Sequence, residues 1–256
     1  MRKESSSVLD RNLPVVEMIR RIKSEHPFWG YRRTWAYLRF VQKMDINKKR
    51  VLRLMRRYDL LVKPNRKLKA NRTPQRSKPR PDRPNQWWGI DMTKVMIEGF
   101  GWVYIVVVLD WYTKKIVGHY AGLQCTTRHW LEALDMGLNR QFKAGSRDQG
   151  LHLMTDNGCQ PTAINFMKSC RDLSIDQAFT SYNNPKGNAD TERVIRTMKE
   201  ECLWLREWIN PLEMVNDLGE WIEKYNNSYL HSALGYKPPA QAEVEYFKEF
   251  SLLKST

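Results

Sequence analysis

The chain has few cysteines and no long apolar run. Its four cysteines, Cys125, Cys159, Cys170 and Cys202, are scattered and form no CxxC pair. This usage argues against a zinc site or a disulfide framework, and we expect buried thiols in a reducing cytoplasm. The longest apolar run, around Val103–Leu109, is strand-sized, well short of the roughly 18 residues of a membrane span. We expect no signal peptide, because the first residues run directly into charged ones.

Acidic residues are scarce in the first third of the chain. Residues 1–80 carry 24 Lys or Arg against 6 Asp or Glu, a net charge of +18, whereas the other 176 residues carry a net charge of −3. This distribution is typical of a nucleic-acid-binding segment joined to a near-neutral globular domain. A membrane-surface role would need an amphipathic anchor or a lipidation motif, and the sequence shows neither.

Three short helices are predicted within residues 1–61, after a frayed polar start over residues 1–12. Apolar residues recur at helical spacing over about Leu13–Ser24 and Tyr31–Phe40, and Asn47 can cap a third helix. The basic residues of the second and third helices that we expect to contact DNA are Arg32, Arg33, Lys48, Lys49, Arg53, Arg56 and Arg57. A basic third helix favours a helix-turn-helix module that contacts DNA. The alternative is a helical bundle with a solvated basic face.

A basic linker is predicted over residues 62–86. It holds nine Lys or Arg, one acidic residue and five prolines, with almost nothing to bury. Such a segment is extended in isolation, and its cations can follow a phosphate backbone. The cations that we expect to contact DNA are Lys63, Arg66, Lys67 and Lys69. An inert linker is the alternative.

The pattern changes to strands from Gln86 onward. Strands are expected at Trp88–Val95, Gly101–Leu109, Ile116–Ala121, Leu151–Met154 and Ile175–Ala178, and helices at Arg128–Phe142, Thr162–Asp172, Asn188–Trp208, Pro211–Ser228 and Pro239–Lys248. Three strands followed by alternating helices and strands predict an α/β domain with a mixed sheet flanked by helices. We assign residues 87–209 to this domain and residues 210–256 to helices that complete it.

Three carboxylates stand out in this domain. Asp91 lies mid-strand in an apolar setting, where a lone buried acid is costly unless it is paired, hydrogen-bonded or metal-bound. Asp156 ends an apolar run before Asn157-Gly158, and Glu192 begins a long helix. Alone, Asp156 could be a turn former and Glu192 a solvated helix residue. Together the three carboxylates could hold a pair of hard divalent cations, because Mg²⁺ prefers oxygen ligands.

Two cations lie close to Glu192 on its predicted helix. Lys199 follows Glu192 by seven residues, so the two lie within about 20° of each other around the helix axis. They border the apolar stripe, which is formed by Ile195, Met198, Cys202 and Leu205. Lys199 and its neighbour Arg196 could hold DNA phosphates. The alternative is a surface Glu–Arg pair.

Four further polar residues have other expected roles. Asp110 most simply shapes a turn, and Asp190 fits a first helical turn, where the helix dipole favours negative charge. His119 is expected as an ordinary sheet residue. His231 is either structural or DNA-facing. The turn-rich stretch Thr180–Gly187 should form a loop over the carboxylates, and its expected DNA contacts are Tyr182, Asn183 and Lys186.

These residues, taken in order, resemble the transposases of the IS3 family of insertion sequences, which are second reading-frame products, and more remotely the retroviral integrases. The 35 residues between Asp156 and Glu192 match the family's D-D(35)-E spacing, and Lys199 stands where the family carries a basic residue. The stretch from Tyr225-Asn226 through His231 to Pro239 resembles the family's closing signature. The resemblance runs from about Gly30 to about Glu245.

The resemblance implies a ribonuclease H-like integrase catalytic domain preceded by a small all-α helix-turn-helix domain. It implies metal-dependent cleavage and strand transfer at insertion-sequence ends, with Asp91, Asp156 and Glu192 holding two Mg²⁺ ions, for which Mn²⁺ can substitute. The implied partners are DNA (terminal inverted repeats and target DNA), further copies of the chain on that DNA, and the upstream-frame helix-turn-helix and leucine-zipper protein. The implied location is the bacterial cytoplasm, at the nucleoid.

Two alternative functions stay open at this point. One is a ribonuclease H-like nuclease without strand transfer, which the helix-turn-helix and basic linker disfavour. The other is a DNA-binding regulator without catalysis, which the three intact carboxylates disfavour.

Overall fold

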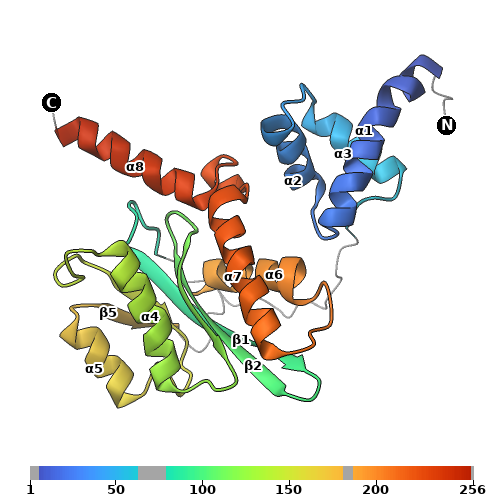
Figure 1. Cartoon of the computed structure of the whole chain (residues 1–256). Coiled ribbons are helices and arrows are strands. Elements are labelled where there is room, and N and C mark those ends of the chain that lie inside the picture. The colour runs from blue at the N-terminus through green and yellow to red at the C-terminus, as the bar shows by residue number, and fades with distance from the viewer. Residues whose placement is uncertain (1–5, 63–78, 181–186, 255–256) are drawn as a thin grey trace, which may run out of the picture. The chain divides into compact units, whose positions relative to one another are not determined.

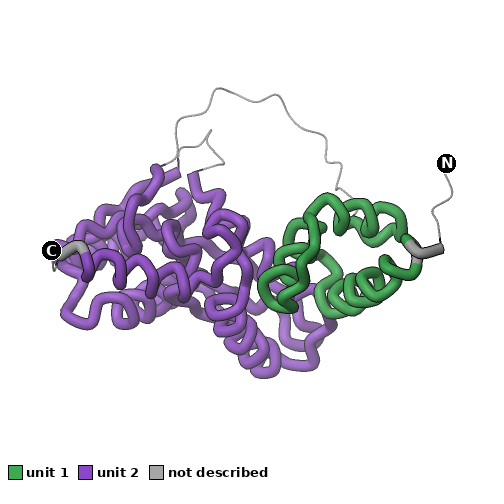
Figure 2. Tube along the Cα trace, turned by 90° about the horizontal axis from the view of Figure 1, so that it is seen from above, with its two compact units in different colours: residues 1–71 green, residues 72–256 purple. Residues whose placement is uncertain are grey.

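The computed structural model describes residues 6–62, 79–180 and 187–254. The chain divides into two compact units, Met1–Asn71 and Arg72–Thr256 (Figure 2). This division falls within the predicted linker, whose candidate DNA contacts Lys63, Arg66, Lys67 and Lys69 lie outside the described residues. The domain bounds inferred from the sequence stay predictions. No helix in the described part is long and apolar enough to cross a membrane.

The first unit is a small helical domain. Its helices are α1 (Ser6–Glu25), α2 (Tyr31–Ala36), the π-helical continuation η1 (Tyr37–Val41) and α3 (Lys48–Arg57). They enclose an apolar core that includes the fully buried Ile19, Leu38 and Met55. As predicted, Asn47 caps α3, its side chain accepting a hydrogen bond from the backbone N of Lys49 (2.8 Å). The expectation of a frayed start over residues 1–12 is wrong from Ser6 onward, because α1 begins there.

The second unit is built on a five-stranded sheet in the order β3-β2-β1-β4-β5. The strands are β1 (Trp87–Ile97), β2 (Gly101–Asp110), β3 (Ile116–Gly122), β4 (His152–Thr155) and β5 (Asp176–Phe179). The first three pair antiparallel, and β4 and β5 extend the sheet in parallel from β1. Such a mixed α/β sheet is the predicted fold class, and its antiparallel half follows from the short turns that join β1, β2 and β3.

Helices cover both faces of this sheet (Figure 1). They are α4 (Thr127–Gln141), α5 (Ile164–Asp172), α6 (Ala189–Met198) with its continuation η2 (Lys199–Leu203), α7 (Pro211–Ser228), the short η3 (Ser232–Leu234) and α8 (Pro239–Lys254). Trp88 and Ile90 of β1 pack with α4 and α5 on one face. Because side chains alternate along a strand, Gly89 and Asp91 face the opposite side, where α6 and α7 pack.

Two predicted helix ends differ from the structure. The helix expected to reach Trp208 ends at Leu203, and Leu205, expected in the apolar stripe, is 46% exposed. The chain turns away here because the amide of Trp204 donates to the carbonyl of Lys199 (2.8 Å), and the Trp208 indole N donates to the Leu203 carbonyl (3.1 Å). The last helix, expected to end near Lys248, continues to Lys254.

Candidate active site

The sheet register places Asp91 beside Asp156. β1 and β4 are neighbouring parallel strands in which Gly89 pairs with Met154. Asp91 and Asp156 each follow this pair by two residues, so the register directs both carboxylates to the same part of the sheet. Neighbouring strands lie only about 4.8 Å apart. Two carboxylates that are 65 positions apart in the sequence therefore meet at one point of the sheet.

The start of α6 is held against the same point of β1. The side-chain amide of Asn188 donates to the carbonyl of Ile90 (3.1 Å), and the indole N of Trp111 donates to the hydroxyl of Thr191 (3.1 Å). Gly89 makes this approach possible, because a Cβ there would lie 2.1 Å from the Thr191 hydroxyl. The first turn of α6, which carries Glu192, is thereby brought next to the residue that precedes Asp91.

The electrostatics of Asp91 reflect this convergence. The pKa of Asp91 is raised to about 6, chiefly by burial and in part by the negative charges of Asp156 and Glu192. The backbone N–H of Met92, which donates to Asp91 Oδ1 (2.7 Å), and the cation of Lys199 both act to lower it. Because the charges of Asp156, Glu192 and Lys199 all act on Asp91, the four side chains lie in one shared site. Asp156 and Glu192 themselves are exposed.

The three carboxylates are not arranged as a preformed metal-binding site. Among the described residues, no group of three or more His, Cys, Asp and Glu side chains could hold a metal ion as it stands. Asp156 Oδ1 accepts a hydrogen bond from the backbone N of Gly158 (3.0 Å), which closes its own turn. The donor set nevertheless fits a divalent cation. It supplies hard carboxylate oxygens, and a cation would offset the burial and the repulsion that together raise the pKa of Asp91.

Lys199 and Arg196 differ in burial and in the groups that they contact. Lys199 is half-buried, and its Nζ lies 5.7 Å from the centre of the Trp204 ring, while its charge reaches Asp91. Arg196 is 68% exposed and pairs with Glu200 (Nε to Oε1, 2.8 Å), the next carboxylate along the helix. The cation of Lys199 therefore acts on Asp91, whereas the ion pair of Arg196 is with Glu200.

The other predicted DNA contacts stay predictions. The loop residues Tyr182, Asn183 and Lys186 lie outside the described residues. Among the cations of the first unit that were predicted to contact DNA, Arg32, Lys49, Arg53, Arg56 and Arg57 are exposed, whereas Arg33 and Lys48 are half-buried. Those two cations lie over tryptophan rings: Arg33 is 5.7 Å from the centre of Trp29, and Lys48 is 4.3 Å from that of Trp35.

Asp110 has the structural role that its position predicts. Its carboxylate accepts hydrogen bonds from the backbone N of Asn85 (3.0 Å), the backbone N of Thr113 (2.8 Å) and the hydroxyl of Thr113 (2.6 Å). Asp110 is 1% exposed. Burial raises its pKa to about 6, against the lowering effect of these three hydrogen bonds. It joins the segment before β1 to the β2–β3 turn.

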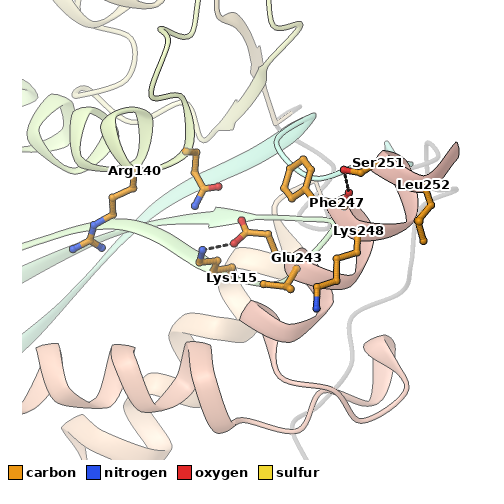
Figure 3. Close-up of a pocket in the computed structure, with 9 residues that line it drawn as sticks. Lys115, Arg140, Glu243, Phe247, Lys248, Ser251 and Leu252 are labelled. Atoms are coloured by element: carbon orange, nitrogen blue, oxygen red, sulfur yellow. Dashed lines mark hydrogen bonds and ion pairs between the residues drawn. The ribbon is translucent and has the colours of Figure 1, made fainter. Parts of the chain in front are cut away.

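A pocket lies apart from the three carboxylates. Its volume is about 760 Å³, and it is lined by α8 and by residues of α4 and the β2–β3 turn. Figure 3 shows Lys115 of that turn reaching Glu243 of α8 across its edge. Asp91, Asp156 and Glu192 do not line this pocket.

The sequence interpretation missed how the first turn of α6 is held in place. Asp190, interpreted only as a helix-dipole residue, forms an ion pair with Lys114 (Oδ2 to Nζ, 2.9 Å). Tyr225 and Asn226, known only as part of the closing signature, bind the backbone of Lys114 and Ile116. The closing signature marked Tyr225 and Asn226 in the sequence, but it did not show which residues they contact.

Comparisons with known proteins agree with this architecture. A model described as an HTH-like domain matches residues 10–67, and two models described as integrase core domains match residues 81–185 and 173–239. The transposase InsD for insertion element IS2A/D/F/H/I/K of Escherichia coli is 26% identical over 236 residues, which cover 89% of this chain and 77% of that protein. The chain is therefore similar over most of its length to transposases of insertion sequences, in agreement with the resemblance of its motifs to the IS3 family.

Two further matches show the same similarity in sequence and in fold. The InsD transposase for insertion element IS2-9 of Escherichia coli strain K12 is also 26% identical over 236 residues, covering 89% of this chain and 76% of that protein. A chain of the simian T-cell lymphotropic virus intasome, solved in complex with the PP2A regulatory subunit B56 gamma, superposes with a TM-score of 0.55 at 16% identity. That match covers 81% of the transposase and 73% of the viral chain, and it shows a shared fold.

Proposed function

We propose that this transposase cleaves DNA at the ends of its insertion sequence and joins them to new DNA, with Asp91, Asp156 and Glu192 as its catalytic carboxylates. The single observation that supports this assignment most directly is electrostatic. Asp156, Glu192 and Lys199 all act on the half-buried Asp91 although they come from different elements of the fold. A half-buried carboxylate whose pKa is raised by its burial and by two nearby carboxylates is a candidate functional residue.

The three carboxylates would hold divalent cations, with Mg²⁺ as the expected ion, two per site, and Mn²⁺ as a substitute. When bound, such a pair activates the attacking oxygen and neutralises charge on the leaving oxygen of a phosphodiester. Lys199 adds a positive charge beside the carboxylates, suited to a non-bridging phosphate oxygen. Arg196, held by Glu200, could join it only after that pair opens.

No protein nucleophile is needed for this chemistry. In the first step, water attacks the phosphodiester at the element end, and the bond to the 3′ oxygen breaks to leave a free 3′-OH. In the second step, that 3′-OH attacks a target phosphodiester and displaces another 3′ oxygen. The buried thiols of Cys170 and Cys202 are unsuited to attack, because burial raises the pKa of each to about 12.

The expected partners are DNA, further copies of the chain and the upstream-frame protein. We infer that the basic helical unit binds the terminal inverted repeats, that the second unit also holds target DNA, and that several copies assemble on the DNA. The upstream-frame helix-turn-helix and leucine-zipper protein would supply further contacts with the ends. The cytoplasm, at the nucleoid, is the location that this activity requires.

The experiment uses labelled insertion-sequence ends, a supercoiled target plasmid and Mg²⁺. Asp91→Asn, Asp156→Asn and Glu192→Gln should each remove both cleavage and joining while end binding persists. Asp135→Asn is the matched control, because Asp135 is an exposed carboxylate on α4 whose contact is with Asn139. Cleavage without joined product would favour the nuclease alternative. Unchanged joining by Asp156→Asn would refute the assignment of the site.

A further inference from the structure

Lys114, in the turn between β2 and β3, has an unusual backbone conformation. Lys114 has φ of +61°, in the left-handed region that non-glycine residues rarely adopt. The turn is closed around it, since its backbone N donates to the carbonyl of Asp110 (2.9 Å). Asp110 in turn accepts the hydrogen bonds of Thr113. Lys114 is therefore presented in a defined orientation.

The side chain of Lys114 reaches the first turn of α6. Its Nζ donates to Asp190 Oδ2 (2.9 Å) and also to the carbonyl of Trp111. The two charged side chains are only 17% and 29% exposed, so salt and water screen their attraction less than at an open surface. Asp190 precedes Glu192 by two residues on the same turn. The ion pair thus holds the helical turn that carries the third carboxylate.

The backbone of Lys114 is held from the other side by the closing segment. The Tyr225 hydroxyl donates to the Lys114 carbonyl (2.9 Å), and His231 Nε2 lies 2.7 Å from the same hydroxyl. Because a tyrosine hydroxyl has one proton, which Tyr225 gives to Lys114, His231 Nε2 must be the donor in the second contact. Asn226 bonds both the backbone N (2.9 Å) and the carbonyl (3.0 Å) of Ile116.

We propose that His231, Tyr225, Lys114 and Asp190 form a positioning chain that sets the placement of Glu192 relative to Asp91. The proposal rests on the proposed function, since it concerns one of the three catalytic carboxylates. It gives His231 a role inside the domain, as the donor that orients the Tyr225 hydroxyl. None of the four residues is assigned contact with DNA or with the reacting atoms.

A neighbouring lysine supplies a matched control. Lys115 belongs to the same turn, is 22% exposed at its side chain, and pairs with Glu243, which is 15% exposed. That pair ties the turn to α8 rather than to α6 (Figure 3). Removing either cation breaks one partly buried ion pair of the same turn. Only loss of the Lys114 cation should alter the position of Glu192.

The experiment compares Lys114→Met, Tyr225→Phe and Lys115→Met in the full chain. Mn²⁺ binding without DNA is followed by electron paramagnetic resonance of the free ion, and the melting temperature is measured in parallel. Strand joining from a pre-cleaved end gives kcat and the KM for DNA separately. Lys114→Met should raise the Mn²⁺ concentration for half-saturation about tenfold, which corresponds to about 1.4 kcal/mol of lost coupling, and lower kcat with KM unchanged.

The control variants separate a failure of the positioning chain from a failure of the proposed function. Lys115→Met should change half-saturation less than twofold, and Lys114→Arg, which keeps a cation, should restore most of the Mn²⁺ binding. Tyr225→Phe should act in the same direction as Lys114→Met even if the latter folds poorly. Equal Mn²⁺ binding by Lys114→Met and Lys115→Met would overturn the positioning chain while Asp156→Asn remains inactive. Joining activity in Asp156→Asn would instead overturn the proposed function.

Discussion

Gly89→Ala should inactivate the transposase without removing a single polar group. The added Cβ would lie 2.1 Å from the Thr191 hydroxyl, 2.5 Å from Asn188 Oδ1 and 2.5 Å from Trp111 Nε1. Ordinary contact begins at 3.4 Å, so the side chains of Thr191, Asn188 and Trp111, which hold the start of α6 against β1, must shift by about 1 Å. A misplacement of that size at a reacting centre costs about 100-fold in rate. Overpacking of this kind also lowers stability by about 1–3 kcal/mol.

The assay measures strand joining from a pre-cleaved end, normalised to the folded fraction from a thermal melt. Gly118→Ala is the control, because a Cβ there would lie 2.1 Å from the carbonyl oxygen of Ala133 on α4. Its clash is with backbone atoms, so it is at least as severe, and it lies on the face of the sheet away from Asp91. Both variants should melt earlier, and only Gly89→Ala should lose joining per folded molecule. Equal specific activity in the two variants would refute the reasoning.

Two further predictions concern stability and DNA binding. Because the pKa of Asp110 is raised to about 6 in the folded protein, the folded state binds a proton more tightly than the unfolded chain. As the pH falls from about 7 to about 5, the free energy of unfolding of the wild type, measured with urea, should therefore rise by about 1.3 kcal/mol relative to that of Asp110→Asn. A difference that stays constant or falls would contradict the burial effect. Lys49→Gln with Arg53→Gln, both exposed on α3, should reduce the salt dependence of end binding by up to about two counterions; an unchanged salt slope would show that this face of α3 does not contact phosphate.

Much of the fold could be predicted because its elements are locally encoded. The β-branched and aromatic run at Gly101–Asp110 becomes the buried central β2, and the basic third helix begins at its predicted cap Asn47. The helix after Glu192 is predicted too long, because apolar spacing continues past Leu203. Where it ends depends on the hydrogen bonds of Trp204 and Trp208.

The sequence by itself determined the order and identity of Asp91, Asp156 and Glu192, and the separation of the basic third from the rest of the chain. Residue type and spacing are written in the chain, so pattern suffices for these features. Only the tertiary structure decided how the carboxylates meet, through the register of β1 with β4 and the close approach of α6 over Gly89. The Lys114–Asp190 pair joins residues 76 positions apart, and contacts at such separations depend on packing that no local periodicity carries.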